Sequence, residues 1–138
     1  MNVSDNCLFC KIVNKEIPAN IVYENEHVLA FLDISPVNKG HTLVIPKKHS
    51  KNILDIEEQD YVELQKAVRI LADKVKNATG ACGVNIMQNN EPCAGQVVFH
   101  SHIHIIPRHE KDGLELWHGQ EYKNEEEMQN LAEKIKNA

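Results

Sequence analysis

Residues 96–107 read QVVFHSHIHIIP, the most strand-like stretch of the chain. Histidine stands at every second position from 100 to 104. Because successive side chains of a strand point to opposite faces, we expect His100, His102 and His104 to share one face. The opposite face would carry Ser101, Ile103 and Ile105, and its isoleucines would pack on a helix. Pro107 is expected to end the strand.

The segments before this strand predict a hairpin and two further strands. Residues 21–23 and 27–33 are strand-like and flank a polar turn at 24–26. A short strand is expected at residues 41–46, where Pro46 stops it, and another at residues 83–89.

Two helices are predicted. Apolar side chains recur at steps of three and four, the period of an amphipathic helix, at Tyr61, Leu64, Val68, Leu71 and Val75. Asp55 is the expected N-terminal cap of this helix and Gly80 its expected C-terminal stop. A tail helix is predicted in residues 124–138, where Asn124 stands three residues before Glu127, as in a capping box.

This order of elements indicates an α+β fold, with a mainly antiparallel five-stranded sheet, one main helix and a C-terminal helix. A chain of 138 residues can build one core, so we expect a single domain at 1–138. Residues 115–138 would form a C-terminal extension of that domain.

Composition excludes several classes of function. The net charge of −5 argues against binding to a nucleic acid polymer, which needs a basic surface. No apolar run approaches the ~20 residues of a membrane span, and the N-terminus lacks the pattern of a signal peptide. We therefore expect a cytoplasmic protein that does not associate with membranes. In that compartment the four cysteines are expected to stay reduced, with Cys82 and Cys93 as small, partly buried residues.

Histidine offers chemistry that other polar residues lack, because it titrates near neutrality, acts as a nucleophile when neutral and ligates metals. The repeat is compatible with a solvated strand face. It is also compatible with a zinc hydrolase, in which two of these histidines hold the metal. A third interpretation is covalent catalysis, in which the middle histidine attacks phosphorus.

Two separated blocks resemble one family. The segment GQVVFHSHIHIIPR is similar to the signature of the histidine triad (HIT) family, and residues 7–49, CLFCKIVNKE through VIPKKH, are similar to its N-terminal half. The match resembles most the nucleotide-binding, Hint-like branch in its compact bacterial form. The resemblance implies a HIT-like fold and a small nucleotide as substrate.

The resemblance also implies catalytic roles. His102 would attack the α-phosphate, and its other ring nitrogen would be anchored on the backbone carbonyl of His100. His104 would contact phosphate oxygens, and His41 matches a further family histidine behind the triad. The loop around the phosphate would be formed by Asn89, Gly95, Gln96 and Val97.

A nucleoside pocket is implied by the same resemblance. Its members would be Phe9, Ile12, Ile17, Phe31, Asp33 and Ile34. Asp33 would bind the ribose hydroxyls, although an Asp two residues before a Ser-Pro pair is equally typical of a turn. Phe31 and Ile34 are equally compatible with plain core positions.

Two positions depart from the family pattern. Ser101 stands where the signature has an apolar residue, and we expect a change of packing there. Val97 stands where many members carry a hydroxyl that is thought to help the leaving group. Water, His104 or the substrate would then supply the proton.

A structural zinc site is a further implication. Some bacterial members and related uridylyltransferases hold zinc with ligands that correspond to Cys7, Cys10, His49 and His100. Two thiolates and two imidazoles fill a tetrahedral zinc site with no open position. Reduced surface thiols and a solvated basic loop are the plainer interpretation of these residues.

The resemblance therefore predicts a hydrolase that cleaves nucleoside 5′-phosphoramidates through a nucleotidyl-histidine. A dinucleoside polyphosphate hydrolase and a non-enzymatic zinc-binding interaction protein are alternatives, and a metallohydrolase is another. A homodimer formed through the main helix and the following strand is expected, with Trp117 in an extension that reaches toward the partner.

Overall fold

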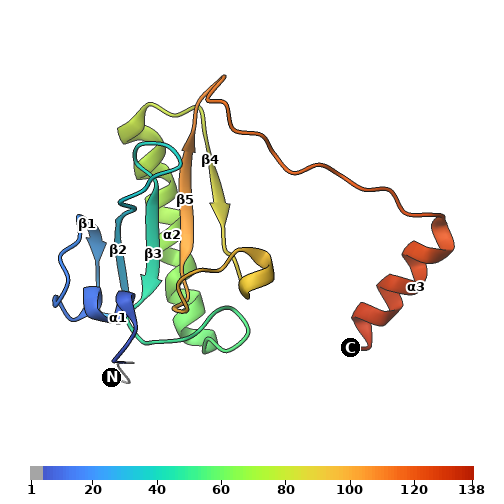
Figure 1. Cartoon of the computed structure of the whole chain (residues 1–138), viewed down its shortest axis with the longest axis horizontal. Coiled ribbons are helices and arrows are strands. Elements are labelled where there is room, and N and C mark those ends of the chain that lie inside the picture. Colours follow the sequence, from blue (N-terminus) through green and yellow to red (C-terminus); the bar gives the residue numbers. More distant parts are fainter. Residues whose placement is uncertain (1–4) are drawn as a thin grey trace.

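A computed structural model describes residues 5–138 of the chain. Residues 1–4, which belong to the predicted domain and to the N-terminus predicted to lack a signal peptide, lie outside the described residues. The chain forms a five-stranded antiparallel sheet in the order β1-β2-β3-β5-β4 (Figure 1). The elements are α1 (Leu8–Val13), β1 (Ile21–Glu24), β2 (Val28–Leu32), β3 (Thr42–Pro46), α2 (Glu58–Thr79), β4 (Gly83–Met87), a 3₁₀ turn η1 (Pro92–Ala94), β5 (Ile103–Arg108) and α3 (Glu125–Lys136). The predicted α+β class is confirmed.

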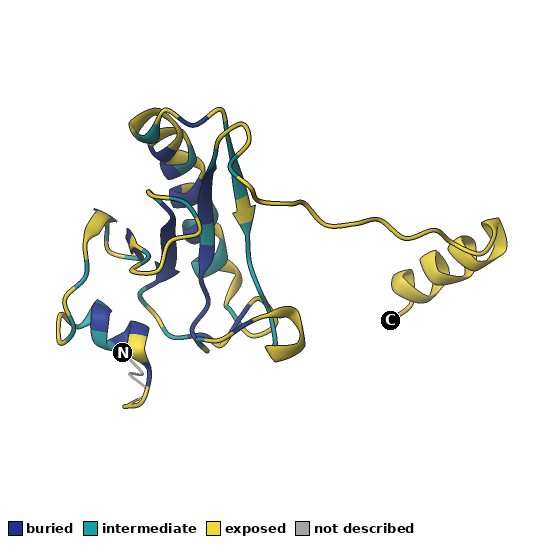
Figure 2. Ribbon diagram, turned by 45° about the horizontal axis from the view of Figure 1, so that its top comes forward, coloured by how far each residue is buried: buried dark blue, intermediate teal, exposed yellow. Residues whose placement is uncertain are grey.

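The long helix α2 covers one face of the sheet. Its buried stripe, which includes Leu64, Val68 and Leu71, packs on Val44 and Ile105 of the central strands. Figure 2 shows the buried residues gathered in these strands and on the helix side that faces them. Removing one such leucine side chain costs about 2–5 kcal/mol of folding free energy.

The ends of α2 test two sequence predictions. Gly80 ends the helix in the left-handed conformation, at φ 66°, as predicted. The predicted cap at Asp55 is wrong, because α2 begins at Glu58 and its cap residue is Glu57. The Asp55 carboxylate instead accepts hydrogen bonds from the backbone N–H groups of Lys51 and Asn52, so it closes the loop before the helix.

The short helix α1, which the sequence analysis did not predict, covers the other face. Its buried Phe9 and Ile12 pack with Phe31 and Leu43 in a second apolar cluster. Cys7 caps this helix, because its Sγ accepts a hydrogen bond from the backbone N–H of Cys10 at 3.2 Å. The C-x-x-C motif thus lies at the N-terminus of a helix against the sheet.

The bounds predicted for the histidine strand are wrong at both ends. Strand β5 begins at Ile103, so His100 and His102 lie in the irregular segment before it and only His104 is a strand residue. The strand also passes through Pro107 to Arg108. A proline is tolerated there because β3 pairs with β5 only as far as Ile105, so the missing N–H has no ladder partner on that side.

The C-terminal extension departs from the body of the protein in an extended segment and ends in α3 (Figure 1). The predicted cap is confirmed, since Oδ1 of Asn124 accepts from the N–H of Glu127 at 2.9 Å. No residue of α3 is buried within the described part of the chain (Figure 2), and its apolar side chains Met128, Leu131 and Ile135 are exposed. Among residues 5–138, none of the helices has the length and apolar character needed to cross a bilayer.

Candidate active site and metal centre

The His102 ring is held by the backbone just before it. Its Nδ1 lies 2.7 Å from the carbonyl oxygen of His100, so Nδ1 carries the hydrogen and donates it. The lone pair is therefore on Nε2. The ring is buried and packs edge-on against Phe9, with ring centroids 5.2 Å apart. This burial lowers the pKa of His102, which keeps the imidazole neutral at pH 7 and nucleophilic.

His41 and His104 form a relay beside His102. The backbone N–H of Val37 donates to Nδ1 of His41 at 3.1 Å, so the hydrogen of the His41 ring is on Nε2. That Nε2 lies 2.9 Å from Nδ1 of His104 and donates to it. The remaining hydrogen of His104 is consequently on its own Nε2.

The Nε2–H of His104 is buried and has no hydrogen-bond partner among the residues that the structure describes. Its ring touches the His102 ring, with centroids 4.9 Å apart. Burial, together with the neighbouring His102 and His41, lowers the pKa of His104 to about 4, so the ring is neutral at pH 7. A buried donor of this kind is suited to an anionic oxygen of a ligand.

The same relay bears on the metallohydrolase interpretation. Ligand atoms of Asp33, His41 and His104 lie within 4.8 Å of one another, as in a metal site. However, Nδ1 of His41 already accepts from Val37, and a neutral imidazole then keeps its hydrogen on Nε2. His41 has no lone pair left for a metal, so the hydrogen-bonded relay explains this cluster better.

A second cluster brings together the four predicted zinc ligands. The atoms that converge are Sγ of Cys7, Sγ of Cys10, Nδ1 of His49 and Nδ1 of His100. Nδ1 of His100 lies 3.4 Å from Cys7 Sγ, 3.5 Å from Cys10 Sγ and 3.3 Å from His49 Nδ1. The cluster is compatible with a metal site in which one residue, His100, belongs to the histidine repeat.

The donor set and its spacing fit a tetrahedral zinc ion. Zinc bonds of about 2.0–2.3 Å place neighbouring ligand atoms roughly 3.3–3.8 Å apart, which matches the observed separations. Nε2–H of His100 donates to the carbonyl of Pro46 at 2.7 Å, which fixes the ring so that the Nδ1 lone pair faces the thiols. Burial lowers the pKa of His100 to about 4, so this lone pair is available at pH 7.

Four of the six residues predicted to line a nucleoside pocket lie together in or beside the second apolar cluster. Phe9, Ile12 and Phe31 are buried in the second apolar cluster, and Ile17 packs at its margin. Ile34 is 94% exposed, which excludes the core position considered for it. Oδ1 of Asp33 accepts from the N–H of Ser35, as in the turn considered for it, and Oδ2 lies 3.8 Å from Nε2 of His41.

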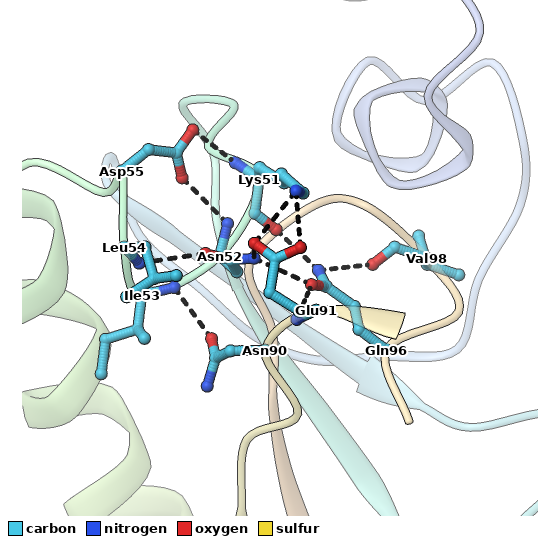
Figure 3. Close-up of polar contacts among 9 residues, drawn as sticks. All are labelled: Lys51, Asn52, Ile53, Leu54, Asp55, Asn90, Glu91, Gln96 and Val98. Carbon is cyan, nitrogen blue, oxygen red and sulfur yellow. Dashed lines mark hydrogen bonds and ion pairs between the residues drawn. The ribbon is translucent and has the colours of Figure 1, made fainter. Parts of the chain in front are cut away.

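The predicted phosphate loop precedes the histidines. Gly95 has φ 92°, a left-handed conformation that favours glycine, and its carbonyl accepts from Nδ2 of Asn89 at 3.4 Å. Val97 is 82% exposed, whereas Gln96 is buried with its side chain inside a polar network (Figure 3). The partners of Gln96 in this network, Asn52 and Glu91, were not among the predicted site residues. The left-handed backbone of Glu91 was not visible in the sequence either.

Ser101, where an apolar residue was expected, is buried and contacts a second serine. Its Oγ lies 2.7 Å from Oγ of Ser50, and its backbone N–H donates to the carbonyl of Ser50 at 2.7 Å. This double contact ties the segment between His100 and His102 to the residue after His49. A hydroxyl in place of an apolar side chain therefore has a polar partner.

The fold and these two sites define a class of protein in which a neutral histidine, His102, is oriented by the backbone beside a Cys₂His₂ cluster. A family model described as the HIT domain matches residues 14–111. The chain belongs to the HIT family.

Relatives cover nearly the whole chain. Protein hit of Bacillus subtilis is 46% identical over 139 residues, which cover 98% of this chain and 95% of that protein. The crystal structure of SMU.412c from Streptococcus mutans UA159 has a TM-score of 0.94 at 45% identity, over 99% of this chain and 88% of that one. Adenylylsulfatase HINT3 of Arabidopsis thaliana is 38% identical over 112 residues, 81% of this chain and 57% of the plant protein.

Proposed function

We propose that the protein hydrolyses nucleoside 5′-phosphate conjugates of the AMP-amine type through a nucleotide bound covalently to His102. The observation that carries this proposal is the 2.7 Å hydrogen bond from His102 Nδ1 to the carbonyl of His100. It leaves a neutral Nε2 lone pair whose direction is fixed by the backbone. Such an imidazole is a competent nucleophile toward phosphorus.

The first half of the reaction displaces the amine. Nε2 of His102 attacks the α-phosphorus, a new nitrogen–phosphorus bond forms, and the bond to the amine breaks with its electron pair going to the amine, which takes up a proton. Nε2–H of His104 and the backbone N–H of Val97 donate to the phosphoryl oxygens, whereas the N–H groups of Gly95 and Gln96 already donate to the carbonyls of Pro92 and Glu91. One such donor is typically worth about 2.7–4 kcal/mol in the transition state.

The second half regenerates the enzyme. Water attacks the same phosphorus and gives up a proton to the solvent, the bond to His102 breaks with its electron pair returning to Nε2, and the nucleotide leaves with a phosphate oxygen from water. The relay from Val37 through His41 keeps His104 in the donor tautomer during both halves. The carboxylate of Asp33 is suited to accept from the ribose hydroxyls, and Ile34 lies next to it as an exposed apolar wall for the base.

A zinc ion held by Cys7, Cys10, His49 and His100 would serve the structure. It would cross-link the start of α1, the loop after β3 and the segment before His102, three parts of the chain that are distant in sequence. A bound zinc ion supplies folding free energy and leaves the chemistry to the histidines. Zinc thiolates also persist best in a reducing compartment, which supports a cytoplasmic location.

A homodimer is the proposed assembly. Strand β4 lies at an edge of the sheet, and edge strands offer unpaired backbone groups to another chain. Ile86 of this strand and Val62 and Ile70 of α2 are exposed apolar side chains. A two-fold contact would bury them on both subunits.

The decisive experiment is to quench a reaction with an AMP-amine conjugate and to look by mass spectrometry for a nucleotide on His102. Adenylyl sulfate and a diadenosine polyphosphate should be compared at equal concentration. We expect an adduct in the wild-type protein and neither adduct nor turnover in His102→Ala. Turnover without an adduct, lost on chelation, would instead support a metallohydrolase. If no conjugate is turned over and His102→Ala leaves partner binding unchanged, a non-enzymatic role would be supported.

A further inference from the structure

The side chain of Gln96 is fully engaged within the protein, although its residue type and place suggest a phosphate contact. Its Nε2 donates to the carbonyls of Lys51 at 2.7 Å and of Val98 at 3.1 Å. Its Oε1 accepts from the backbone N–H of Glu91 at 2.9 Å. Both amide hydrogens are therefore donated to carbonyls (Figure 3), and the residue is only 4% exposed.

Asn52 connects this side chain to the opposite loop. The residue is 1% exposed, and its Nδ2 lies 3.0 Å from both Gln96 Oε1 and Glu91 Oε1. Its Oδ1 accepts from the backbone N–H of Leu54, which holds the amide in one orientation. Asn52 lies in the loop between β3 and α2, whereas Glu91 and Gln96 lie between β4 and β5.

The backbone conformation of Glu91 indicates that the surrounding hydrogen bonds hold this loop in place. Its backbone has φ 74° and ψ 153°, a region that is almost restricted to glycine. A side chain remains in such a conformation only where its surroundings fix it. Here Nζ of Lys51 lies 2.8 and 3.0 Å from the two carboxylate oxygens, and the Glu91 N–H is held by Gln96. Strain of this kind is concentrated at functional sites.

The segment held in this way leads directly into the histidines. It contains η1, Gly95 and the exposed Val97, and it continues through Val98 to His100. The Gln96 side chain is hydrogen-bonded to this segment at two points: it accepts from the N–H of Glu91 and donates to the carbonyl of Val98. The N–H groups of Gly95 and Gln96 donate to the carbonyls of Pro92 and Glu91, so among residues 95–97 only the N–H of Val97 has no acceptor in the described part of the chain. That N–H is thereby fixed relative to the loop that carries His49.

We propose that Asn52, Glu91 and Gln96 are positioning residues that clamp residues 91–98, and so set the backbone N–H of Val97 that meets the phosphate. This inference rests on the proposed function, and it gives Gln96 an indirect role in place of a direct phosphate contact. Loss of a clamp residue is expected to lower the rate of the chemical step. A displaced N–H donor weakens its hydrogen bond to the phosphoryl oxygen, and that bond stabilises mainly the transition state.

The test combines steady-state kinetics on an AMP-amine conjugate with a double-mutant cycle. Asn52→Ala and Gln96→Ala should each lower kcat about tenfold or more while KM changes less than twofold. The double variant should lose little beyond either single variant, because residues of one network are not additive. A direct phosphate contact by Gln96 predicts the opposite: a raised KM in Gln96→Ala and additive effects with Asn52→Ala.

Glu91→Gln provides a variant that is safe for folding, because the carboxylate is partly exposed. It removes the ion pair with Lys51 and keeps an acceptor for Asn52, so a smaller loss of kcat, about threefold, is expected. The matched control is Glu24→Gln. Glu24, on the opposite outer strand β1, pairs equally closely with Lys15, at 3.0 and 3.1 Å, and with Lys47, at 2.9 Å, and Glu24→Gln should leave kcat unchanged.

Amide hydrogen exchange supplies a readout independent of turnover. Asn52→Ala should speed exchange in residues 91–99 and leave the buried part of α2 unchanged. Normal kcat and normal exchange in Asn52→Ala would overturn the clamp while the proposed function stands. A wild-type protein without turnover on any of the three nucleotide conjugates would overturn both.

Discussion

Nε2 of His41 lies 2.9 Å from Nδ1 of His104, and this contact determines which nitrogen of His104 can serve a substrate. His41 is itself oriented by the N–H of Val37. The two hydrogen bonds together leave His104 with an N–H at Nε2, next to the His102 ring. A backbone group outside the triad therefore sets the tautomer of a side chain inside it.

Loss of this relay should slow the reaction. In His41→Phe, His104 has no donor at Nδ1 and can adopt the other tautomer, so we expect kcat to fall about 10²-fold on an AMP-amine conjugate. His41→Gln can restore a donor and should recover part of the rate. His27→Gln is the control, since the His27 ring is partly exposed and pairs with Glu26 outside the site. An unchanged kcat in His41→Phe would remove the relay from the mechanism.

Val97 offers a test of how the leaving group is protonated. The side chain is 82% exposed, so Val97→Ser should not alter the thermal midpoint. A hydroxyl at this place can donate to the departing nitrogen, and one hydrogen bond of about 1.4 kcal/mol corresponds to roughly tenfold in rate. We expect that gain with alkylamine conjugates and none with a good leaving group such as sulfate. An equal effect on both substrates would mean that the proton comes from elsewhere.

Local periodicity predicted the parts of the fold that local forces control. The stripe from Leu64 to Val75 and the αL stop at Gly80 are confirmed, because a helix records its buried face in its own sequence. Helix α1 escaped prediction because six residues are too few to show a period, and the C-x-x-C motif drew a metal interpretation instead of a helical one. The start of β5 was wrong because His102 is held by the carbonyl of His100, and alternation of residue types cannot reveal such a bond.

In the candidate site, too, some residues could be predicted from the sequence and others could not. The resemblance supplied the four residues of the Cys₂His₂ cluster, which the structure brings together across more than 90 positions of sequence. It could not supply the network around Gln96, because Asn52 lies 44 positions away and no local signal marks it. The backbone of Glu91 is a tertiary effect, since its conformation depends on Lys51 in another loop.

Removal of zinc should destabilise the protein before it affects the chemistry. The wild-type chain is expected to hold one zinc ion, measured by atomic emission, and Cys10→Ser should hold less. Free zinc at 100 times its Kd stabilises the folded state by about 2.7 kcal/mol, so chelation should lower the thermal midpoint by several degrees. Below the apoprotein midpoint the His102 adduct should still form. Immediate loss of the adduct on chelation at low temperature would assign zinc a catalytic role.

Acid should weaken the fold through His104. Its pKa is lowered to about 4 in the folded protein by burial, from a usual value of 6.5. The unfolded chain therefore takes up a proton first as the pH falls, and stability is lost progressively between about pH 6.5 and pH 4. His104→Gln should lose less stability over this range in urea titrations, and His118→Gln, at an exposed tail position, should behave as wild type. Zinc release affects all three proteins alike, so the difference between them isolates His104.

The two edges of the sheet allow a matched test of the homodimer. Val22 on β1 and Ile86 on β4 are each 45% exposed, and each lies on an outer strand. A charge on β4 would be buried at the proposed two-fold contact, whereas a charge on β1 would remain in water. We expect light scattering to show a dimer for the wild type and for Val22→Lys, and a monomer for Ile86→Lys at the same concentration. A dimer that survives Ile86→Lys but not Val22→Lys would move the contact to the other edge, and a monomeric wild-type protein would refute the assembly.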